Sequence, residues 1–225
     1  MTNPLDPHVL AQSLLNWVPL VLSLTVHEWA HAWSAFKLGD DTAARAGRLT
    51  LNPLPHIDLL GTVLLPLFFA PLGVPIGWAK PVPFNPTRFT RKVSMTTGTM
   101  ITKAAGPISN LVLALASTLV LALLFRFASS VLESAPVLVR LLVMMMTINV
   151  VLALFNLLPI HPLDGAGVLE GVLPDRFRGA WARVCRYSPL FLVVIMVMGV
   201  GPILGRPINV LMGGLMRLLE AVASG

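Results

Sequence analysis

The sequence predicts an all-α polytopic membrane protein with about five to six transmembrane helices and a Pro/Gly-rich re-entrant or hairpin segment after the first helix. Hydrophobic residues make up 56% of the 225-residue chain and charged residues only 12%, whereas soluble proteins average about 25% charged. The mean hydropathy is +0.81. The apolar residues also gather in long uncharged stretches, and a membrane-spanning helix requires about 20 such residues.

Five stretches without a charged side chain are the candidate membrane crossings. They cover residues 9–26, 59–79, 104–125, 141–163 and 187–205. A shorter apolar piece at 207–216 is expected to form either a sixth span or an interfacial helix. Because no soluble segment separates these stretches, we expect one integral-membrane domain over 1–225, with a core at about 9–173 and accessory C-terminal helices at about 187–222.

Proline and glycine interrupt the second stretch. Pro66, Pro71 and Pro75 divide it into pieces that are too short to cross a membrane as one straight helix. We therefore expect residues 59–79 either to dip into the membrane and return or to cross it twice.

Two histidines bracket a glutamate at the end of the first stretch, in His27-Glu28-Trp29-Ala30-His31. Positions i and i+4 of an α-helix differ by about 40° in azimuth and about 6 Å in height, so both imidazoles can reach one tetrahedral Zn²⁺. Glu28 lies about 100° further round the helix, beside the metal, where it suits a general base acting on metal-bound water. The motif predicts one zinc ion per chain and a hydrolase at or inside a membrane.

The end of the fourth stretch, from Phe155 to Gly165, is the second informative segment. Pro159 and Pro162 are expected to end the helix, and Gly165 permits a turn. Asp164 is then presented on irregular backbone at membrane depth, which is tolerated only around a cavity or a site buried in protein. Its carboxylate is a suitable third zinc ligand and leaves the fourth position for water.

A shared metal site also constrains the topology. For Asp164 to meet the histidines, the first and fourth stretches must run the same way across the membrane, so residues 59–79 must return to the side that they left. Twelve of the sixteen lysines and arginines then lie on the active-site side: Lys37, Arg45, Arg48, Lys80, Arg88, Arg91, Lys92, Lys103, Arg176, Arg178, Arg183 and Arg186. By the positive-inside rule, the active-site end faces the cytoplasm, and we expect the plasma (inner) membrane of a prokaryote.

Together these segments resemble the site-2 proteases, the intramembrane zinc metalloproteases of peptidase family M50, in their compact form without a PDZ domain. The resemblance covers about residues 20–170. Its elements, in the family's order, are His27-Glu28-Trp29-Ala30-His31, Gly47-Arg48-Leu49-Thr50-Leu51-Asn52-Pro53, Gly77-Trp78-Ala79-Lys80-Pro81-Val82-Pro83, Ala105-Gly106-Pro107-Ile108-Ser109-Asn110, and Asn156 with Leu163-Asp164-Gly165.

The resemblance implies roles for the residues at the centre of these motifs. His27, His31 and Asp164 would bind zinc, and Glu28 would activate water. Asn156 would hold the scissile carbonyl or its oxyanion, for which an amide donor in a dry site is well suited.

The resemblance also implies how substrate is held. The segment from Gly77 to Pro83 is similar to the family's extended re-entrant segment, which binds an unwound transmembrane segment as an added strand. The expected substrate-binding set is Gly77, Trp78, Lys80, Pro81 and Asn110. The implied partners are transmembrane protein substrates and the lipid bilayer, and the oligomeric state is left open.

Some features depart from the family's pattern or call for a separate interpretation. Ala166 stands where the family commonly has a second glycine after its aspartate, which matters only if that position requires a positive φ. His161 replaces an expected apolar residue or proline, and we expect a non-catalytic polar contact there, with a ligand or proton-relay role as the alternative. His56 is expected to support loop structure, with metal binding as the alternative.

Two other function classes compete with intramembrane proteolysis. A zinc transporter or channel would use the same ligand types along a permeation path, and a non-catalytic membrane scaffold would keep the fold alone. The net charge of +6 does not indicate nucleic-acid binding, because the basic residues are spread through the loops between apolar stretches. A single cysteine, Cys185, excludes an intramolecular disulfide and a cysteine-based zinc cluster.

Overall fold

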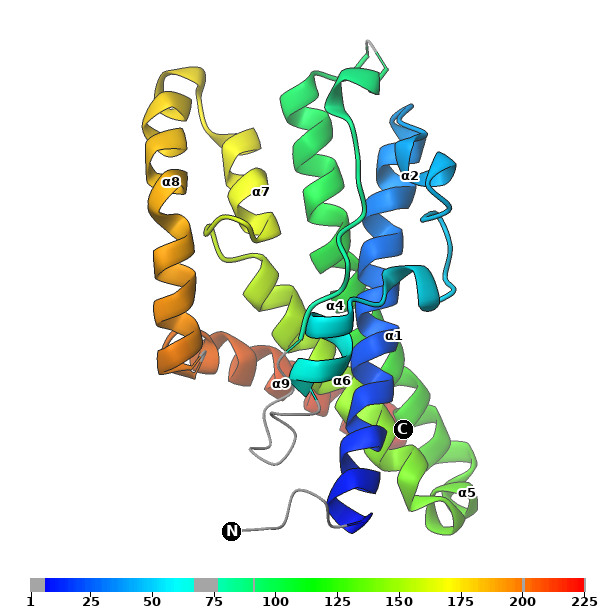
Figure 1. The fold of residues 1–225 in the computed structure, drawn as a ribbon. Helices are drawn as coiled ribbons and strands as arrows, with labels where there is room; N and C mark the ends of the chain where they lie inside the picture. Colours follow the sequence, from blue (N-terminus) through cyan, green and yellow to red (C-terminus); the bar gives the residue numbers. More distant parts are fainter. Residues whose placement is uncertain (1–6, 67–76, 91, 200, 225) are drawn as a thin grey trace.

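The computed structural model describes residues 7–66, 77–90, 92–199 and 201–224, and every regular element in these residues is helical, as predicted (Figure 1). Three of the short elements are 3-10 or π helices, and these are labelled η. The elements are α1 (Pro7–Lys37), α2 (Thr42–Arg45), η1 (Leu54–His56), η2 (Leu59–Leu64), η4 (Pro86–Arg88), α4 (Met95–Phe127), α5 (Ser129–Ser134), α6 (Pro136–Asn156), α7 (Asp164–Val172), α8 (Asp175–Met198) and α9 (Gly201–Ser224).

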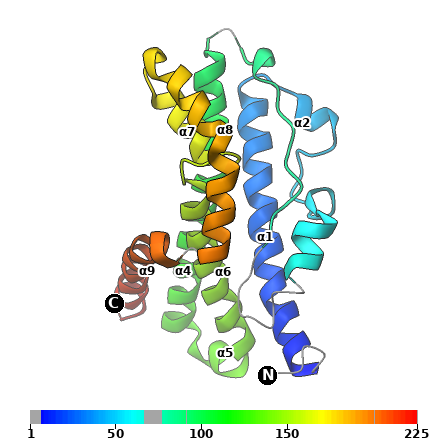
Figure 2. The ribbon, with the colours of Figure 1, turned by 60° about the vertical axis from the view of Figure 1, so that its left-hand side comes forward.

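Helix α4 is the centre of the bundle. It packs against α1 and α6 along its length and also contacts α7 and α9 (Figure 1, Figure 2). Its buried face carries small side chains, with Ala114, Thr118 and Ala122 at 1% exposure or less. Small residues let helix backbones approach closely, which is the packing that membrane bundles favour.

The helix ends follow local chemistry. Helix α4 begins after Ser94, whose hydroxyl accepts a hydrogen bond from the Thr97 amide at 3.0 Å. Gly39 follows the end of α1 with a φ of +104°, and a side chain there would collide with Thr90. These two features fix the direction in which the chain leaves α1 and enters α4.

Helices α1 and α6 run in the same direction and α4 runs against them, so the chain leaves α1 and enters α4 at the same end of the bundle (Figure 1). This is the relation that a shared metal site requires of the first and fourth stretches. Part of the second stretch, residues 67–76, lies outside the described residues. The prediction that 59–79 either dips into the membrane or crosses it twice therefore stays a prediction.

Two helices of the described chain, α4 and α6, are long and apolar enough to cross a membrane. Only 33% and 28% of their most apolar windows are buried, whereas the core helix of a soluble protein is mostly buried. Val112 and Val120 of α4, for example, are 59% and 47% exposed. Their outward apolar faces are typical of helices surrounded by lipid.

The C-terminal prediction needs correction. The apolar stretch at 187–205 is not one helix: α8 ends before Gly199, which has a φ of +77°, and α9 begins at Gly201. Helix α9 includes the piece at 207–216 and runs across α4 rather than alongside it (Figure 1, Figure 2). This orientation favours the interfacial alternative over a sixth span.

Candidate metal centre

Helix α1 presents two histidines on one face, one turn apart. The Nε2 atoms of His27 and His31 are 3.0 Å apart, and the rings meet edge to face with centroids 4.6 Å apart. The residues are 5% and 7% exposed. Because the i, i+4 spacing places both rings on one side of α1, their Nε2 atoms converge on the same point.

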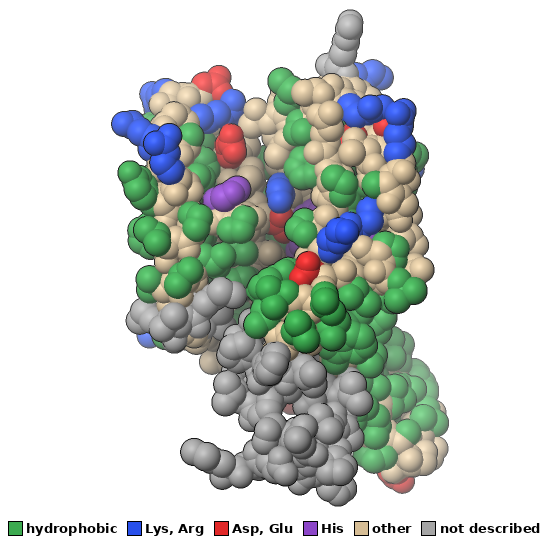
Figure 3. Space-filling view, viewed as in Figure 1, with side chains coloured by type: hydrophobic (Ala, Val, Ile, Leu, Met, Phe, Trp, Pro, Cys, Tyr) green, Lys and Arg blue, Asp and Glu red, His purple; other side chains and the backbone are tan. Residues whose placement is uncertain are grey.

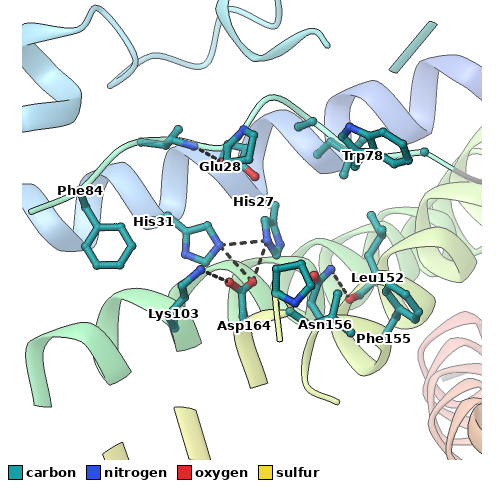
Figure 4. Close-up of a pocket in the computed structure, with 17 residues that line it drawn as sticks. His27, Glu28, His31, Trp78, Phe84, Lys103, Leu152, Phe155, Asn156 and Asp164 are labelled. Atoms are coloured by element: carbon teal, nitrogen blue, oxygen red, sulfur yellow. Dashed lines mark hydrogen bonds and ion pairs between the residues drawn. The ribbon is translucent and has the colours of Figure 1, made fainter. Parts of the chain in front are cut away.

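Asp164 meets the two histidines from the other half of the chain (Figure 4). Its Oδ2 atom lies 3.1 Å from the Nε2 atom of His27 and 3.2 Å from that of His31. The residue is 5% exposed. The structure therefore brings together the three side chains predicted to share a metal ion.

The backbone around Asp164 differs from the prediction. Helix α6 ends at Asn156, and Asp164 is the first residue of α7 rather than part of the irregular segment before it. Gly165 is also helical, and a side chain there would collide with the carbonyl of Leu157. Gly165 is thus required for a close backbone approach and not for a turn.

The donor triangle fits a tetrahedral metal site. Its sides are 3.0, 3.1 and 3.2 Å, and the edge of a tetrahedron with arms of about 2.0–2.1 Å is about 3.3–3.4 Å. Gly106 of α4 lies directly against the triangle, because a Cβ at this position would meet His31 Nε2 and His27 Cε1. The missing side chain leaves room beside the donors, so His27, His31 and Asp164 could hold a zinc ion.

A cavity of about 390 Å³ opens beside these donors. Side chains of α1, α4, α6, the segment before α7 and the first residue of α7 line it, together with part of an extended segment at 77–85 (Figure 4). The lining residues are Leu24, His27, Glu28, His31, Gly77, Trp78, Ala79, Pro81, Val82, Phe84, Lys103, Leu152, Phe155, Asn156, Pro162, Leu163 and Asp164. Figure 3 shows the molecule hollowed between the α7–α8 pair and the rest of the bundle, with acidic, basic and histidine side chains inside the hollow.

Glu28 lines this cavity but does not belong to the donor set. Its Oε2 atom accepts a hydrogen bond from the amide of Val82 at 2.8 Å. The residue is 9% exposed. The carboxylate is therefore next to the donor triangle and oriented by the extended segment.

The two predicted asparagines lie in different places. Asn156 lines the cavity, and its side-chain amide donates to the carbonyl of Leu152 at 2.9 Å. Asn110, which we expected in the substrate-binding set, is fully buried outside the cavity lining. Its Oδ1 atom lies 2.6 Å from Nδ1 of His27, so it contacts the back of a predicted ligand rather than the space for substrate.

The extended segment is held mainly through its main chain. The Trp78 amide donates to the Gly61 carbonyl at 3.2 Å and the Lys80 amide to the His56 carbonyl at 2.9 Å. Of the predicted substrate-binding residues here, Gly77, Trp78 and Pro81 line the cavity. Lys80 does not line it, and its side chain is exposed.

Two functional candidates were missing from the sequence prediction. The Nζ atom of Lys103 lies 3.1 Å from Asp164 Oδ1, and Lys103 lines the cavity. Its place at the edge of the apolar stretch at 104–125 was the available signal. Arg48 is 7% exposed and donates to the carbonyls of Lys80 at 2.5 Å and Pro81 at 3.4 Å. Its place in the motif at 47–53 was the available signal, although the motif does not indicate this contact.

The remaining singled-out residues lie away from the donors. His161 is exposed and outside the cavity lining. His56 is buried, with Nε2 2.9 Å from the carbonyl of Thr50, in agreement with a loop-supporting role. Ala166 is helical with a negative φ, so the methyl group that it adds introduces no backbone strain.

Comparison with known proteins supports the same chemistry. The sequence model of Peptidase family M50 matches residues 128–199, which contain Asn156 and Asp164. The chain is 36% identical over 207 residues to the protein named "Putative zinc metalloprotease YwhC" of Bacillus subtilis, covering 91% of this chain and 90% of that protein. It is 32% identical over 180 residues to "Putative zinc metalloprotease Rip2" of Mycolicibacterium smegmatis, covering 79% of this chain and 64% of that protein.

A second Rip2, from Mycobacterium tuberculosis, is 31% identical over 187 residues, covering 83% of this chain and 67% of that protein. No solved structure matches the chain. The relationship to YwhC extends over nearly the whole of both chains, and the converging His27, His31 and Asp164 supply a site for the metal. The chain therefore belongs to peptidase family M50, the site-2 protease family, and is a zinc metalloprotease.

Proposed function

We propose that this protein is an intramembrane endopeptidase that hydrolyses peptide bonds in the transmembrane segments of other membrane proteins, as in regulated intramembrane proteolysis. The observation that carries the proposal is the placement of the His27–His31–Asp164 donor set and the Glu28 carboxylate on one cavity among apolar helices. A substrate that reaches this cavity from the lipid would be a hydrophobic segment.

Glu28 is the proposed general base. Zinc, when bound, supplies an activated water and polarises the scissile carbonyl. Glu28 would accept the proton of that water and later deliver it to the leaving amine. The hydrogen bond from the Val82 amide supports this role, because it orients a carboxylate that lies outside the donor set.

Asn156 is the proposed partner of the scissile carbonyl. It lines the cavity at the end of α6, and only one of the two hydrogens on its amide nitrogen is needed for the bond to Leu152. The other hydrogen can be donated to oxygen. Such a donor gains most in a dry site, where negative charge develops on the substrate.

The extended segment at 77–85 is the proposed holder of substrate. A transmembrane helix hides its amides within the helix, so cleavage requires local unwinding, and an edge strand can pair with the exposed main chain. Trp78 and Lys80 direct their amides to the rest of the protein. Among the described residues, Ala79 between them has no hydrogen-bond partner for its amide or carbonyl, and it lines the cavity.

The proposed orientation places the active-site end toward the cytoplasm, in the plasma membrane of a prokaryote. Lysine and arginine side chains gather at the end of the molecule where α1 ends and α4 begins, on the face shown in Figure 3. Positive charge on short loops marks the cytoplasmic side of membrane proteins.

The decisive experiment compares Glu28→Gln with wild type in proteoliposomes that carry a panel of single-pass transmembrane segments. We expect Glu28→Gln to keep one zinc ion per chain and to lose roughly 10²- to 10⁴-fold in cleavage rate, the usual contribution of a general base. Glu170→Gln, which changes an exposed carboxylate of α7, is the matched control and should cleave like wild type.

Three outcomes would contradict the proposal. Retained cleavage by Glu28→Gln would remove the general-base mechanism. Zinc flux into the vesicles, without cleavage of any segment by wild type, would favour the transporter alternative, and neither flux nor cleavage would favour the scaffold.

A further inference from the structure

Four residues on one face of α4 lie against the metal donors: Thr102, Lys103, Gly106 and Asn110. At about 100° per residue, all four lie within a stripe about 100° wide along the helix. We propose that this stripe sets the metal affinity of the site, with Asn110 and Lys103 as positioning residues for His27 and Asp164. The proposal concerns metal binding and does not rest on the identity of the substrate.

Asn110 is held in one orientation by a chain of hydrogen bonds that ends on backbone carbonyls. Asn149 Nδ2 lies 2.7 Å from the Met145 carbonyl, which can only accept, so Oδ1 of Asn149 must face Asn110. Asn110 therefore turns its Nδ2 to Asn149, at 2.7 Å, and its Oδ1 to His27. The Met145 carbonyl thus determines which side-chain atom is oxygen and which is nitrogen in both Asn149 and Asn110.

The orientation of Asn110 selects the tautomer of His27. Since Oδ1 of Asn110 can only accept, Nδ1 of His27 carries the proton, and the Nε2 lone pair is left to face Asp164 and His31. A ligand histidine needs this lone pair, and its other nitrogen usually donates to an oxygen that fixes the ring.

The Thr102 carbonyl does the same for His31, with its oxygen 2.6 Å from Nδ1. Carbonyl oxygens cannot donate, so Nε2 of His31 also points at the donor triangle with a lone pair. Two lone pairs and a carboxylate oxygen then meet at 3.0–3.2 Å. A cation stabilises such a cluster, which is why the preset tautomers favour metal binding.

Lys103 orients the third ligand. Its Nζ atom holds Oδ1 of Asp164 at 3.1 Å, while Oδ2 faces both histidines. The carboxylate is thus divided, with one oxygen for the lysine and one for the metal, and Asp164 is held as a ligand through a single oxygen. Gly167 of α7 leaves room for the Lys103 side chain, because a Cβ at position 167 would lie only 3.0 Å from Cγ of Lys103.

Zinc affinity tests the role of Asn110, measured on the full chain in detergent by competition with a chromophoric chelator. Asn110→Leu should bind zinc about 10- to 100-fold more weakly, the usual effect of removing an outer partner of a ligand. Asn110→Asp keeps an oxygen facing Nδ1 and should bind zinc more tightly than Asn110→Leu, although its second oxygen loses the bond to Oδ1 of Asn149. Thr118→Val is the matched control, because Thr118 is a fully buried polar residue of the same helix whose hydroxyl, within the described part of the chain, bonds the Ala114 carbonyl and none of the metal donors.

The affinity results separate positioning from packing. Zinc affinity of Asn110→Leu within about twofold of wild type would overturn the proposal. An equal loss in Thr118→Val would also overturn it, since any buried polar substitution would then weaken the site. If Asn110→Leu does not fold, Asn149→Leu serves instead: it leaves His27 untouched, frees the Asn110 amide to rotate, and should still weaken zinc binding.

Cobalt substitution tests the role of Lys103. In Lys103→Met both carboxylate oxygens of Asp164 can turn to the ion, so the visible absorption of bound Co²⁺ should weaken as its coordination number rises above four. Lys92→Met, which changes an exposed lysine, should keep the wild-type spectrum. An unchanged spectrum in Lys103→Met would show that the lysine does not position the ligand.

Discussion

The cavity has two walls that are built in opposite ways. The metal wall, His27, His31, Asp164 and Lys103, consists of side chains on helices α1, α4 and α7, bonded to one another. The extended wall, residues 77–85, has no regular element before η4 and is held largely through main-chain groups by residues far away in the sequence. Helices suit a metal, which needs donors fixed to tenths of an ångström, and a main-chain edge suits peptides of varied sequence.

The largest effect is expected from a substitution that disrupts the metal wall alone. Gly106→Ala places a methyl group against the rings of His27 and His31, so we expect zinc affinity to fall on the order of 100-fold or more, and cleavage with it. Elemental analysis of the purified protein gives the zinc content, and thermal unfolding reports whether the bundle is intact.

Gly179→Ala is the control for this change, because a side chain at Gly179 of α8 would meet nothing within 4 Å. It should keep full zinc. A zinc-replete, active Gly106→Ala protein would show that the donors have more room than the structure indicates.

A smaller effect is expected from a substitution that disrupts the extended wall and leaves the metal site intact. Arg48→Met removes the donors to the Lys80 and Pro81 carbonyls and leaves polar groups without partners, which costs about 1–3 kcal/mol at a buried site. We expect zinc content to be unchanged and cleavage to fall about tenfold because the extended segment is no longer held in place, which corresponds to about 1.4 kcal/mol of transition-state stabilisation. Cleavage kinetics and zinc content of the same preparation provide the measurement.

Arg45→Met is the matched control for Arg48→Met. Arg45 lies three residues away, and its side chain is 67% exposed in an ion pair with Asp41. Exposed pairs contribute little, so activity should remain near wild type. Joint loss of zinc and activity in Arg48→Met would mean that the two walls are not separable.

The smallest effect concerns the surface anchor of the extended wall. Arg88 bonds Asp41 at 2.7 Å, and Asp41 also pairs with Arg45. Partial loss of water raises the pKa of Asp41, but the hydrogen bond from Arg45 and the charges of both arginines outweigh this and leave the pKa below its usual value. A carboxyl whose pKa is lower in the folded state stabilises the fold fully above its unfolded-state pKa of about 3.9. This contribution is lost as the pH falls from that value through the lowered folded-state pKa.

Asp41→Asn should therefore lower the melting temperature slightly at pH 7, and the difference from wild type should disappear as the pH approaches that of carboxyl protonation. Thermal unfolding at several pH values measures it. Asp175→Asn, at a carboxylate 89% exposed in a local pair with Arg178, should show no larger change. If the melting temperature of Asp41→Asn fell further below that of wild type as the pH was lowered, the expected pH dependence would be wrong.

The metal wall was largely predictable because helix geometry fixes it. Spacing of i, i+4 determines how His27 and His31 face, and the requirement that Asp164 join them determines the direction of α6. The partners on α4 were not predictable in the same way. Whether Asn110 faces a ligand or the substrate depends on how α4 is rotated against α1, and the composition of an apolar helix contains little information about that rotation.

The extended wall and the C-terminal helices were less predictable for a different reason. The resemblance indicated an extended segment from Gly77, but Arg48 and Glu28 reach it across long sequence separations that no local pattern reveals. Gly199 looked like one more small residue in an apolar stretch, yet its positive φ ends α8. Hydropathy reports burial in lipid or protein and does not report backbone direction.

The donor triangle joins residues that are far apart along the chain, since His27 lies on α1 and Asp164 is the first residue of α7. An ion held there acts as a clasp between the two halves of the bundle, and its binding energy adds to the stability of the folded chain. At a free zinc concentration a hundred times the dissociation constant, this addition is about 2.7 kcal/mol. The free zinc concentration then sets the stability of the folded chain as well as whether its metal site is filled.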